Sequence, residues 1–374
     1  MSQNNTHPSA AKPYLEAIIP FHIGSCFVQI VDDVVGMFFW VHGPGFVIWN
    51  WKTGEQIVVR HQFDVQRILL PDAPLPPERT DTLPPGTWDF AFISPRAFML
   101  ATVDGPGSIE LFMFEATSSS EGPVHVASLR LPELQQGQEL TSITTHSAPF
   151  LAHPIPPGAP FYANQDERIH ALSLRYVDRG GLRIVMILKN SALLRYIPSD
   201  VNIGGKRTEK LVVPWAEWGP RNTRFMDCLI RSSWLRYVHG QRIVLPDQPI
   251  MPPNDPDGSY IPEPLQPVRV MDFNCNPKRI DDPCPLPTLD TDAGAGDASS
   301  LETYEIIAEP TIIPKGEIFA ADVESHLPYS ITTRLFSADY TGFMLDDERL
   351  VGMKHTAFAE FSTPADRDMD VFVF

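Results

Sequence analysis

The clearest fold signal in this chain is the run Ile48-Trp49-Asn50-Trp51-Lys52-Thr53-Gly54-Glu55. Successive side chains of a strand point to opposite faces, so the two tryptophans share one face, and Ile48 and Asn50 share the other. Thr53-Gly54 supplies a tight turn, because glycine adopts a positive φ without a Cβ clash. The stretch therefore predicts the end of one strand, a turn and the start of the next strand.

A second group of short apolar runs follows, between Asp89 and Phe114. The turn residues Ser94-Pro95-Arg96 and Asp104-Gly105-Pro106-Gly107 divide it into three strands, and the run from His125 to Leu131 supplies a fourth. This order predicts an antiparallel meander. Both groups resemble the four-stranded blade of a WD-type β-propeller, in which an apolar-Trp-Asp/Asn run meets Thr-Gly. The resemblance implies an all-β repeat protein and favours binding over chemistry.

The composition agrees with an all-β chain that has many loops. Of 374 residues, 38 are proline, and proline breaks helices and weakens central strands. Apolar residues make up 43% of the chain, which excludes a largely disordered protein. No long stretch has a 3.6-residue apolar period. We therefore predict a β-propeller of about six four-stranded blades, with five to seven allowed.

The net charge of −17 argues against general nucleic-acid binding, which depends on Lys and Arg facing phosphates. The apolar stretch from Ile18 to Val41 contains His22 and the Asp32-Asp33 pair, so we read it as strands and not as a membrane span. The first residues are polar and show no secretory signal. Four cysteines without short paired spacing fit a reducing compartment, so we expect a cytoplasmic or nuclear protein.

We expect a flexible tail over residues 1–25 and one propeller over 26–374, with long loops at 71–85, 246–267 and 281–302. The first predicted blade has strands at 27–30, 34–41, 46–51 and 56–59. Later strands are predicted at 168–177, 182–188, 193–197, 234–238, 242–245, 268–274, 304–308, 318–323, 331–336, 342–345, 349–353 and 371–374, and a new unit begins near Thr223. The C-terminal strand is expected to complete a blade begun by the other terminus.

The sequence contains no constellation that predicts catalysis or a cofactor. The acidic loop around Asp290, Asp292 and Asp297 lacks the glycine and the final carboxylate of an EF-hand loop. Cys275 and Cys284 have no zinc-site spacing. The paired carboxylates, such as Asp32-Asp33, lie at predicted turns, where carboxyl groups normally face solvent. We therefore expect no metal and no cofactor.

The densest group of residues typical of binding hot spots lies between Trp215 and Phe225. Tryptophan and arginine are both enriched in hot spots, although a tryptophan in a propeller often packs between blades. We therefore name Trp215, Trp218, Arg221 and Arg224 as candidate partner-binding residues, with packing as the alternative role.

Four motifs resemble the C-terminal propeller-like region of F-box proteins of mushroom-forming fungi. They are Val47 to Glu55, Asp89 to Pro95, Trp218-Gly219-Pro220 with Thr223-Arg224, and Tyr237 to Arg242. The resemblance covers the chain from about Cys26 onward and implies substrate-type binding of a protein partner. The residues before the first predicted strand are too few for the three helices of an F-box, so recruitment of the cullin-ligase adaptor is not expected.

The leading hypothesis is a monomeric, non-enzymatic protein-interaction module that binds neither nucleic acid nor membrane. One alternative is a propeller hydrolase or lyase with a central-channel site, and another is a carbohydrate-binding propeller. The enzyme would need ionisable residues on the innermost strands. The predicted inner strands at 27–30 and 90–93 are apolar apart from Gln29, which disfavours an enzyme.

Overall fold

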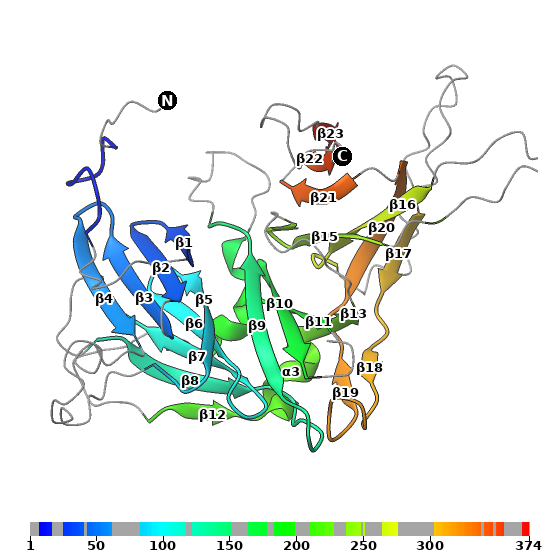
Figure 1. Cartoon of the computed structure of the whole chain (residues 1–374), viewed down its shortest axis with the longest axis horizontal. Helices are drawn as coiled ribbons and strands as arrows, with labels where there is room; N and C mark the ends of the chain where they lie inside the picture. Colours follow the sequence, from blue (N-terminus) through cyan, green and yellow to red (C-terminus); the bar gives the residue numbers. More distant parts are fainter. Residues whose placement is uncertain are drawn as a thin grey trace, which may run out of the picture.

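A computed structural model provides the structure of the protein. The residues that it describes are 7–16, 25–40, 43–61, 83–116, 122–150, 164–177, 183–198, 209–227, 237–247, 250, 264–275, 303–337, 340–346, 349–354 and 369–373. All but one of the sheets that these residues form have three to five strands, and most strands pair antiparallel (Figure 1). The all-β class predicted from the sequence is confirmed.

The first sheet is the predicted meander. Its strands are β1 (Ser25–Val31), β2 (Val34–Trp40), β3 (Pro44–Asn50) and β4 (Glu55–His61), hydrogen-bonded in chain order. Gly54 has a φ of 71° in the turn between β3 and β4, where its lack of a Cβ was predicted to matter.

The second sheet is also a meander, with one added strand. It contains β5 (Thr87–Ser94), β6 (Ala97–Thr102), β7 (Ser108–Met113) and β8 (Val124–Arg130). A distant segment, β12 (Leu211–Val213), extends its edge by pairing parallel to β8. The third sheet has the order β13-β11-β10-β9 and consists of β9 (Leu140–Ser147), β10 (Ile169–Tyr176), β11 (Arg183–Lys189) and β13 (Thr223–Asp227).

The C-terminal third of the chain forms the remaining sheets. The fourth sheet has the order β14-β15-β16-β20-β17 and consists of β14 (Val238–His239), β15 (Arg242–Pro246), β16 (Leu265–Asp272), β17 (Thr303–Ile307) and β20 (Tyr329–Ser337). A separate pair consists of β18 (Thr311–Ile313) and β19 (Val323–Ser325). The last sheet consists of β21 (Tyr340–Leu345), β22 (Arg349–Lys354) and β23 (Met369–Val373).

Helices are few and short in the described residues. They are the 3-10 turn η1 (Gln165–Glu167), α2 (Asn190–Leu194) and α3 (Trp215–Asn222). None of them is long and apolar enough to cross a membrane.

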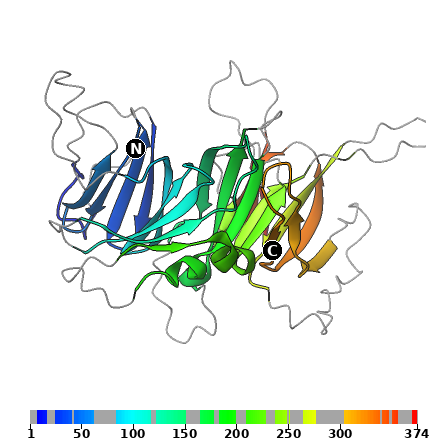
Figure 2. The same ribbon diagram turned by 90° about the horizontal axis from the view of Figure 1, so that it is seen from below.

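The sheets follow one another along an arc. The first strands of successive sheets are in contact, because β1 lies against β5, β5 against β9, β9 against β14 and β14 against β21. Figure 1 shows β1 and the β21–β23 sheet on the two sides of the opening of this arc, and Figure 2 shows the sheets in a row from the blue end to the orange end. Within the described residues, no strand of the first sheet pairs with a strand of the last sheet.

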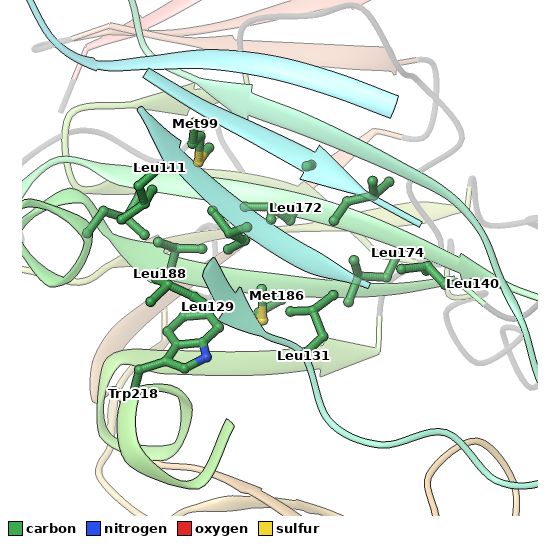
Figure 3. Close-up of a cluster of buried hydrophobic side chains, with 14 of the residues drawn as sticks. Met99, Leu111, Leu129, Leu131, Leu140, Leu172, Leu174, Met186, Leu188 and Trp218 are labelled. Atoms are coloured by element: carbon green, nitrogen blue, oxygen red, sulfur yellow. The ribbon is translucent and has the colours of Figure 1, made fainter. Parts of the chain in front are cut away.

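The core lies between the sheets of this arc. The second and third sheets enclose one large cluster, to which α3 contributes Trp218 (Figure 3). An aromatic cluster that includes Phe38, Phe46, Phe90 and Phe98 fills the space between the first and second sheets. A third cluster joins the third, fourth and last sheets. Burial of these apolar faces is the main force that holds neighbouring sheets together.

The structure corrects several predicted elements. Residues 193–197 were predicted as a strand but contain the end of α2 and a turn, since short apolar runs do not distinguish strand from helix. Residues 318–323 were also predicted as a strand, but they contain bends, an isolated bridge at Phe319 and only the first residue of β19. Thr223 does not begin a fourth unit, because β13 pairs with β11 in the third sheet. Strand β9 was not predicted at all.

Two further predictions concern connections. The C-terminal strand β23 pairs with β22 and not with the N-terminal sheet, so the expected shared blade is absent from the described residues. Residues 265–267 of the predicted loop 246–267 belong to β16. The predicted loop 281–302 and most of 71–85 lie outside the described residues. Part of the predicted tail, residues 7–16, contacts the first sheet, where Trp49 Nε1 donates to the carbonyl of Glu16 at 2.8 Å.

Candidate interaction surface

The four residues predicted to bind a partner divide into two buried side chains, one partly buried side chain and one exposed side chain. Trp218 and Arg224 are each 1% exposed, so neither reaches a partner in this structure. Trp215 is partly buried, and Arg221 in the last turn of α3 is exposed. The structure therefore brings the four residues together in one segment but gives them different roles.

Trp218 attaches α3 to the second sheet. Its indole Nε1 donates to the carbonyl of Arg130 at the end of β8, at 2.8 Å, and its ring enters the core shown in Figure 3. Trp215 packs edge-on against Trp218, with ring centroids 5.2 Å apart. Its ring occupies the space that a side chain at Gly219 would need, since a Cβ there would lie 2.3 Å from it. The inner side of α3 is thus fixed by packing.

Arg224 attaches the following strand to the C-terminal part of the chain. Its Nε donates to the carbonyl of Leu327 at 2.7 Å, and its Nη1 donates to the carbonyl of Glu309 at 2.7 Å and to Thr311 Oγ1 at 3.0 Å. Burial of this guanidinium group lowers its pKa. Arginine suits such a position because its planar group holds several donors in a fixed geometry.

The segment before α3 is fixed through Glu110 of β7. Glu110 Oε1 accepts from Ser108 and Ser128 at 2.5 and 2.9 Å, and its Oε2 lies 2.7 Å from His125 Nε2. Lys210, which precedes β12, places its Nζ 3.9 Å from the same Oε2. Burial alone would raise the pKa of Glu110, but these hydrogen bonds together hold that pKa below its ordinary value.

Other side chains of this segment are exposed. Leu211 and Val212 of β12 are each 52% exposed, whereas the next residue, Val213, is buried. We define the β12–α3 surface as Leu211, Val212, Trp215 and Arg221. Sequence reasoning identified Trp215 and Arg221 but missed the two aliphatic residues, for which the run Leu211-Val212-Val213 before a proline was the available signal.

The Glu110 cluster does not form a nucleophile with a base. A catalytic serine needs a base that accepts its proton and a third group that orients the base. Here Ser108, Ser128 and His125 all meet the same carboxylate, which therefore separates the hydroxyl groups from the imidazole. The cluster links β7, β8 and the start of β12, which is a structural role.

A second group of buried ionisable side chains joins neighbouring sheets near their first strands. Asp89 of β5 is 5% exposed and accepts from the backbone N–H groups of Thr145 in β9 and of Phe90, at 2.5 and 2.8 Å. Burial raises the pKa of Asp89 to about 7, against the effect of these two donors. Sequence reasoning missed Asp89 as an inner-strand residue, because the predicted strand began at Phe90.

Arg168 and Asn190 extend these connections between the second and third sheets. Arg168 Nη2 donates to the carbonyl of Phe92 at 2.7 Å, and Asn190 Nδ2 donates to the carbonyl of Ile93 at 2.8 Å. His170 Nε2 lies 2.9 Å from Asn190 Oδ1, and burial lowers the pKa of His170 to about 3. Arg168 and Asn190 thus bind backbone groups at the end of β5, and all three side chains are buried.

Within the described residues, no group of three or more His, Cys, Asp or Glu side chains could hold a metal ion. The predicted acidic loop around Asp290 lies outside these residues. Comparisons with protein-family models, with curated proteins and with solved structures give no match to this chain.

Proposed function

We propose that this chain is a protein-interaction module built on a β-propeller, and that it binds its partner through the β12–α3 surface. The observation that carries the proposal is the contrast within one segment. Trp218, Arg224 and Lys210 bind the segment to the sheets, while Leu211 and Val212 are half exposed and Arg221 is exposed. Exposed apolar side chains often mark a protein-binding surface, and tryptophan and arginine are enriched in binding hot spots.

The proposed propeller is supported by the order of the sheets. Successive meanders contact one another through their first strands, as the innermost strands of neighbouring blades do in a propeller. The protein would then resemble the substrate-binding half of an F-box protein. We propose the cytoplasm or nucleus as its compartment, a choice supported by Cys26 and Cys275, which are free thiols.

The enzyme alternative has less support from the geometry. Two acid–base groups at or next to the first strands, Asp89 and His170, are at most 5% exposed and are hydrogen-bonded to neighbouring protein groups, and His146 of β9 is partly buried against the ring of Tyr237. General acid–base catalysis needs a group within reach of a substrate proton. Asp89 and His170 act instead as connections between sheets.

The proposal is tested by affinity purification of the tagged full chain from its native cells. We expect the double variant Leu211→Ser, Val212→Ser and the single variant Arg221→Glu to lose most of the protein partners that the wild type recovers. The matched control is Tyr304→Ser, because Tyr304 of β17 is 49% exposed and lies on the fourth sheet. Equal recovery by all variants would reject the surface, and stoichiometric recovery of the cullin-ligase adaptor would contradict substrate-type binding alone.

A further inference from the structure

The N-terminal segment, residues 7–16, lies on the first sheet and binds it through main-chain groups. The backbone N–H of Ala11 donates to the carbonyl of Lys52 at 2.8 Å, and the carbonyl of Glu16 accepts from Trp49 Nε1 at 2.8 Å. Figure 1 shows this segment beside the turn between β3 and β4. Such main-chain hydrogen bonds do not depend on the side chains that the segment carries, so an extended peptide of another protein can form them as well.

One side chain of the segment provides an apolar anchor. Leu15 packs against a cluster of Phe39, Val47 and Trp49, each of which is at most 4% exposed. Among the described apolar residues of this cluster, Leu15 is the one that comes from outside the first sheet. Leu15 therefore holds the segment on the sheet by removing apolar surface from water.

A second side chain, Lys12, crosses the turn between β3 and β4 at Gly54. Its Nζ donates to the carbonyl of Gly54 at 3.4 Å. A Cβ at Gly54 would lie 2.6 Å from Lys12 Cδ, so the missing side chain of this glycine leaves the space that the lysine stem occupies. The turn thus accepts a long unbranched side chain that carries a hydrogen-bond donor at its end.

The segment has few contacts for its length. Within the described residues it is held by the hydrogen bonds of Ala11, Lys12 and Glu16 and by the packing of Leu15, and the His7 ring meets Trp51 edge-on at 5.2 Å between centroids. Apart from the partly buried Ala10 and Leu15, all of its residues are exposed. Segments with few buried apolar contacts open locally at a lower free energy than core strands. The segment can therefore leave the sheet without unfolding it.

We propose that this part of the first sheet is a second protein-binding site, which the N-terminal segment occupies in the free protein. The partner that we infer is an extended peptide with a lysine three residues before a leucine, the spacing of Lys12 and Leu15. The net charge of −17 favours such a peptide over an acidic one. This peptide site contains no residue of the β12–α3 surface and does not rest on it. We define the peptide site as Phe39, Val47, Trp49, Lys52 and Gly54.

The tether makes the N-terminal segment a competitor of the partner. A short stretch of chain joins the segment to β1, so the segment reaches the peptide site at an effective concentration in the millimolar range. A free peptide with the same contacts binds well only when the tethered contact is weakened. The segment therefore controls access to the peptide site.

The experiment uses the full chain and a fluorescein-labelled peptide with the sequence of residues 7–16, in fluorescence anisotropy titrations. Leu15→Ser in the protein weakens the tethered segment and leaves the peptide site intact. We expect this variant to bind the peptide at least about tenfold more tightly than the wild type, in which the tethered segment competes. The matched control is Tyr14→Ser, because Tyr14 is 64% exposed, and it should bind the peptide as weakly as the wild type.

Peptide variants test the proposed partner chemistry on the Leu15→Ser protein. A peptide with Leu15→Ser should lose at least about tenfold in affinity, since it lacks the apolar anchor. A peptide with Lys12→Ala should also bind more weakly, and one with Tyr14→Ser should bind like the unchanged peptide. Equal affinity of all these peptides would overturn the proposal, as would equal binding of the unchanged peptide by the Leu15→Ser protein and the wild type.

If the Leu15→Ser protein does not fold, hydrogen exchange in the wild type decides. Local opening of the segment predicts that the Ala11 N–H, which donates to Lys52, exchanges at least about tenfold faster than the ladder amides of β3. Exchange of Ala11 as slow as in β3 would show that the segment is a permanent part of the fold, and it would overturn the proposal. Neither result bears on the β12–α3 surface, which is tested separately.

Discussion

Arg96 binds Asp33 through two parallel hydrogen bonds, from Nη1 to Oδ1 and from Nη2 to Oδ2, both 2.7 Å long. Asp33 lies in the turn between β1 and β2, and Arg96 in the turn between β5 and β6, so the pair joins the first sheet to the second. The hydrogen bonds from Arg96 lower the pKa of Asp33, although burial opposes this effect. The sequence predicted that Asp33 faces solvent in a turn, but its carboxylate connects the first sheet to the second.

Replacing Arg96 with alanine is expected to lower the free energy of unfolding by about 1 kcal/mol at pH 7, after allowance for partial solvent screening. Because the folded-state pKa of Asp33 is lowered, the stabilisation is present above about pH 4 and is lost as the pH falls further. The difference in unfolding free energy between wild type and Arg96→Ala should therefore become smaller at acidic pH. Urea unfolding at several pH values measures it.

Lys52→Ala is the matched control for that prediction. Lys52 Nζ lies 3.5 Å from Asp32 Oδ1, and both side chains are largely exposed. Such a pair contributes little, so the change should stay within about 0.5 kcal/mol. An equal loss in both variants would contradict a special role for the Asp33–Arg96 pair.

We expect Asp89 to lower the stability of the protein as the pH rises, which is opposite in sign to the effect of Asp33. Its folded-state pKa is raised to about 7 by burial, so its contribution to stability is complete below about pH 4 and is lost as the pH rises through 7. Asp89→Asn should flatten this dependence between pH 4 and 8. It should also destabilise the fold by about 1–3 kcal/mol, because an amide NH₂ then faces a backbone N–H group.

Unfolding free energies at pH 5 and pH 8 test this prediction, with Asp104→Asn at an exposed turn as control. The control should behave like the wild type within about 0.5 kcal/mol. If the unfolding free energy of Asp89→Asn fell between pH 5 and pH 8 as much as that of the wild type, the pH dependence would have to come from other groups.

The two roles within the predicted Trp and Arg group can be separated by mutation. Trp218→Ala removes a buried ring and its hydrogen bond to Arg130, so we expect a loss of about 3–5 kcal/mol. Arg221→Ala changes an exposed side chain, and its effect on stability should stay within about 0.5 kcal/mol. Thermal unfolding distinguishes the two, and a large loss in Arg221→Ala would show that Arg221 also holds the fold.

Gly36 of β2 permits close contact between the first and second sheets. A Cβ at this position would lie 2.7 Å from the ring of Phe92 in β5, which is itself fully buried. Gly36→Ala should therefore destabilise the protein by about 1–3 kcal/mol through overpacking. The control for this prediction is Asp104→Asn in an exposed turn. Gly105→Ala is not a suitable control, because Gly105 has a positive φ.

Sequence reasoning predicted those strands whose signals are local. The meander from β1 to β4 was predicted because alternation and turn chemistry are both present between Val34 and Glu55. Strand β9 was missed because its run Leu-Thr-Ser-Ile-Thr-Thr-His-Ser looks polar, and only its pairing with β10 defines it as a strand. Strand β12 is apolar but only three residues long, and it was missed because its partner β8 is far away in the sequence.

The sequence singled out the segment that contains Trp218 and Arg221, but it did not indicate which of these side chains is buried. Tryptophan and arginine favour both core packing and partner contact, so composition could not separate Trp218 from Arg221. Burial separates them. Trp218 is buried where its indole donates to the carbonyl of the distant residue Arg130, and the neighbouring Arg224 is buried where it donates to the carbonyl of Leu327. The inner position of Asp89 likewise depends on β9, whose location the sequence did not indicate.

Hydrogen–deuterium exchange with the purified partner tests directly whether this chain binds a protein through the β12–α3 surface. We expect partner addition to slow exchange in residues 209–222 and to leave β17, which carries the exposed Tyr304, unchanged. Slower exchange elsewhere, with none in residues 209–222, would contradict it.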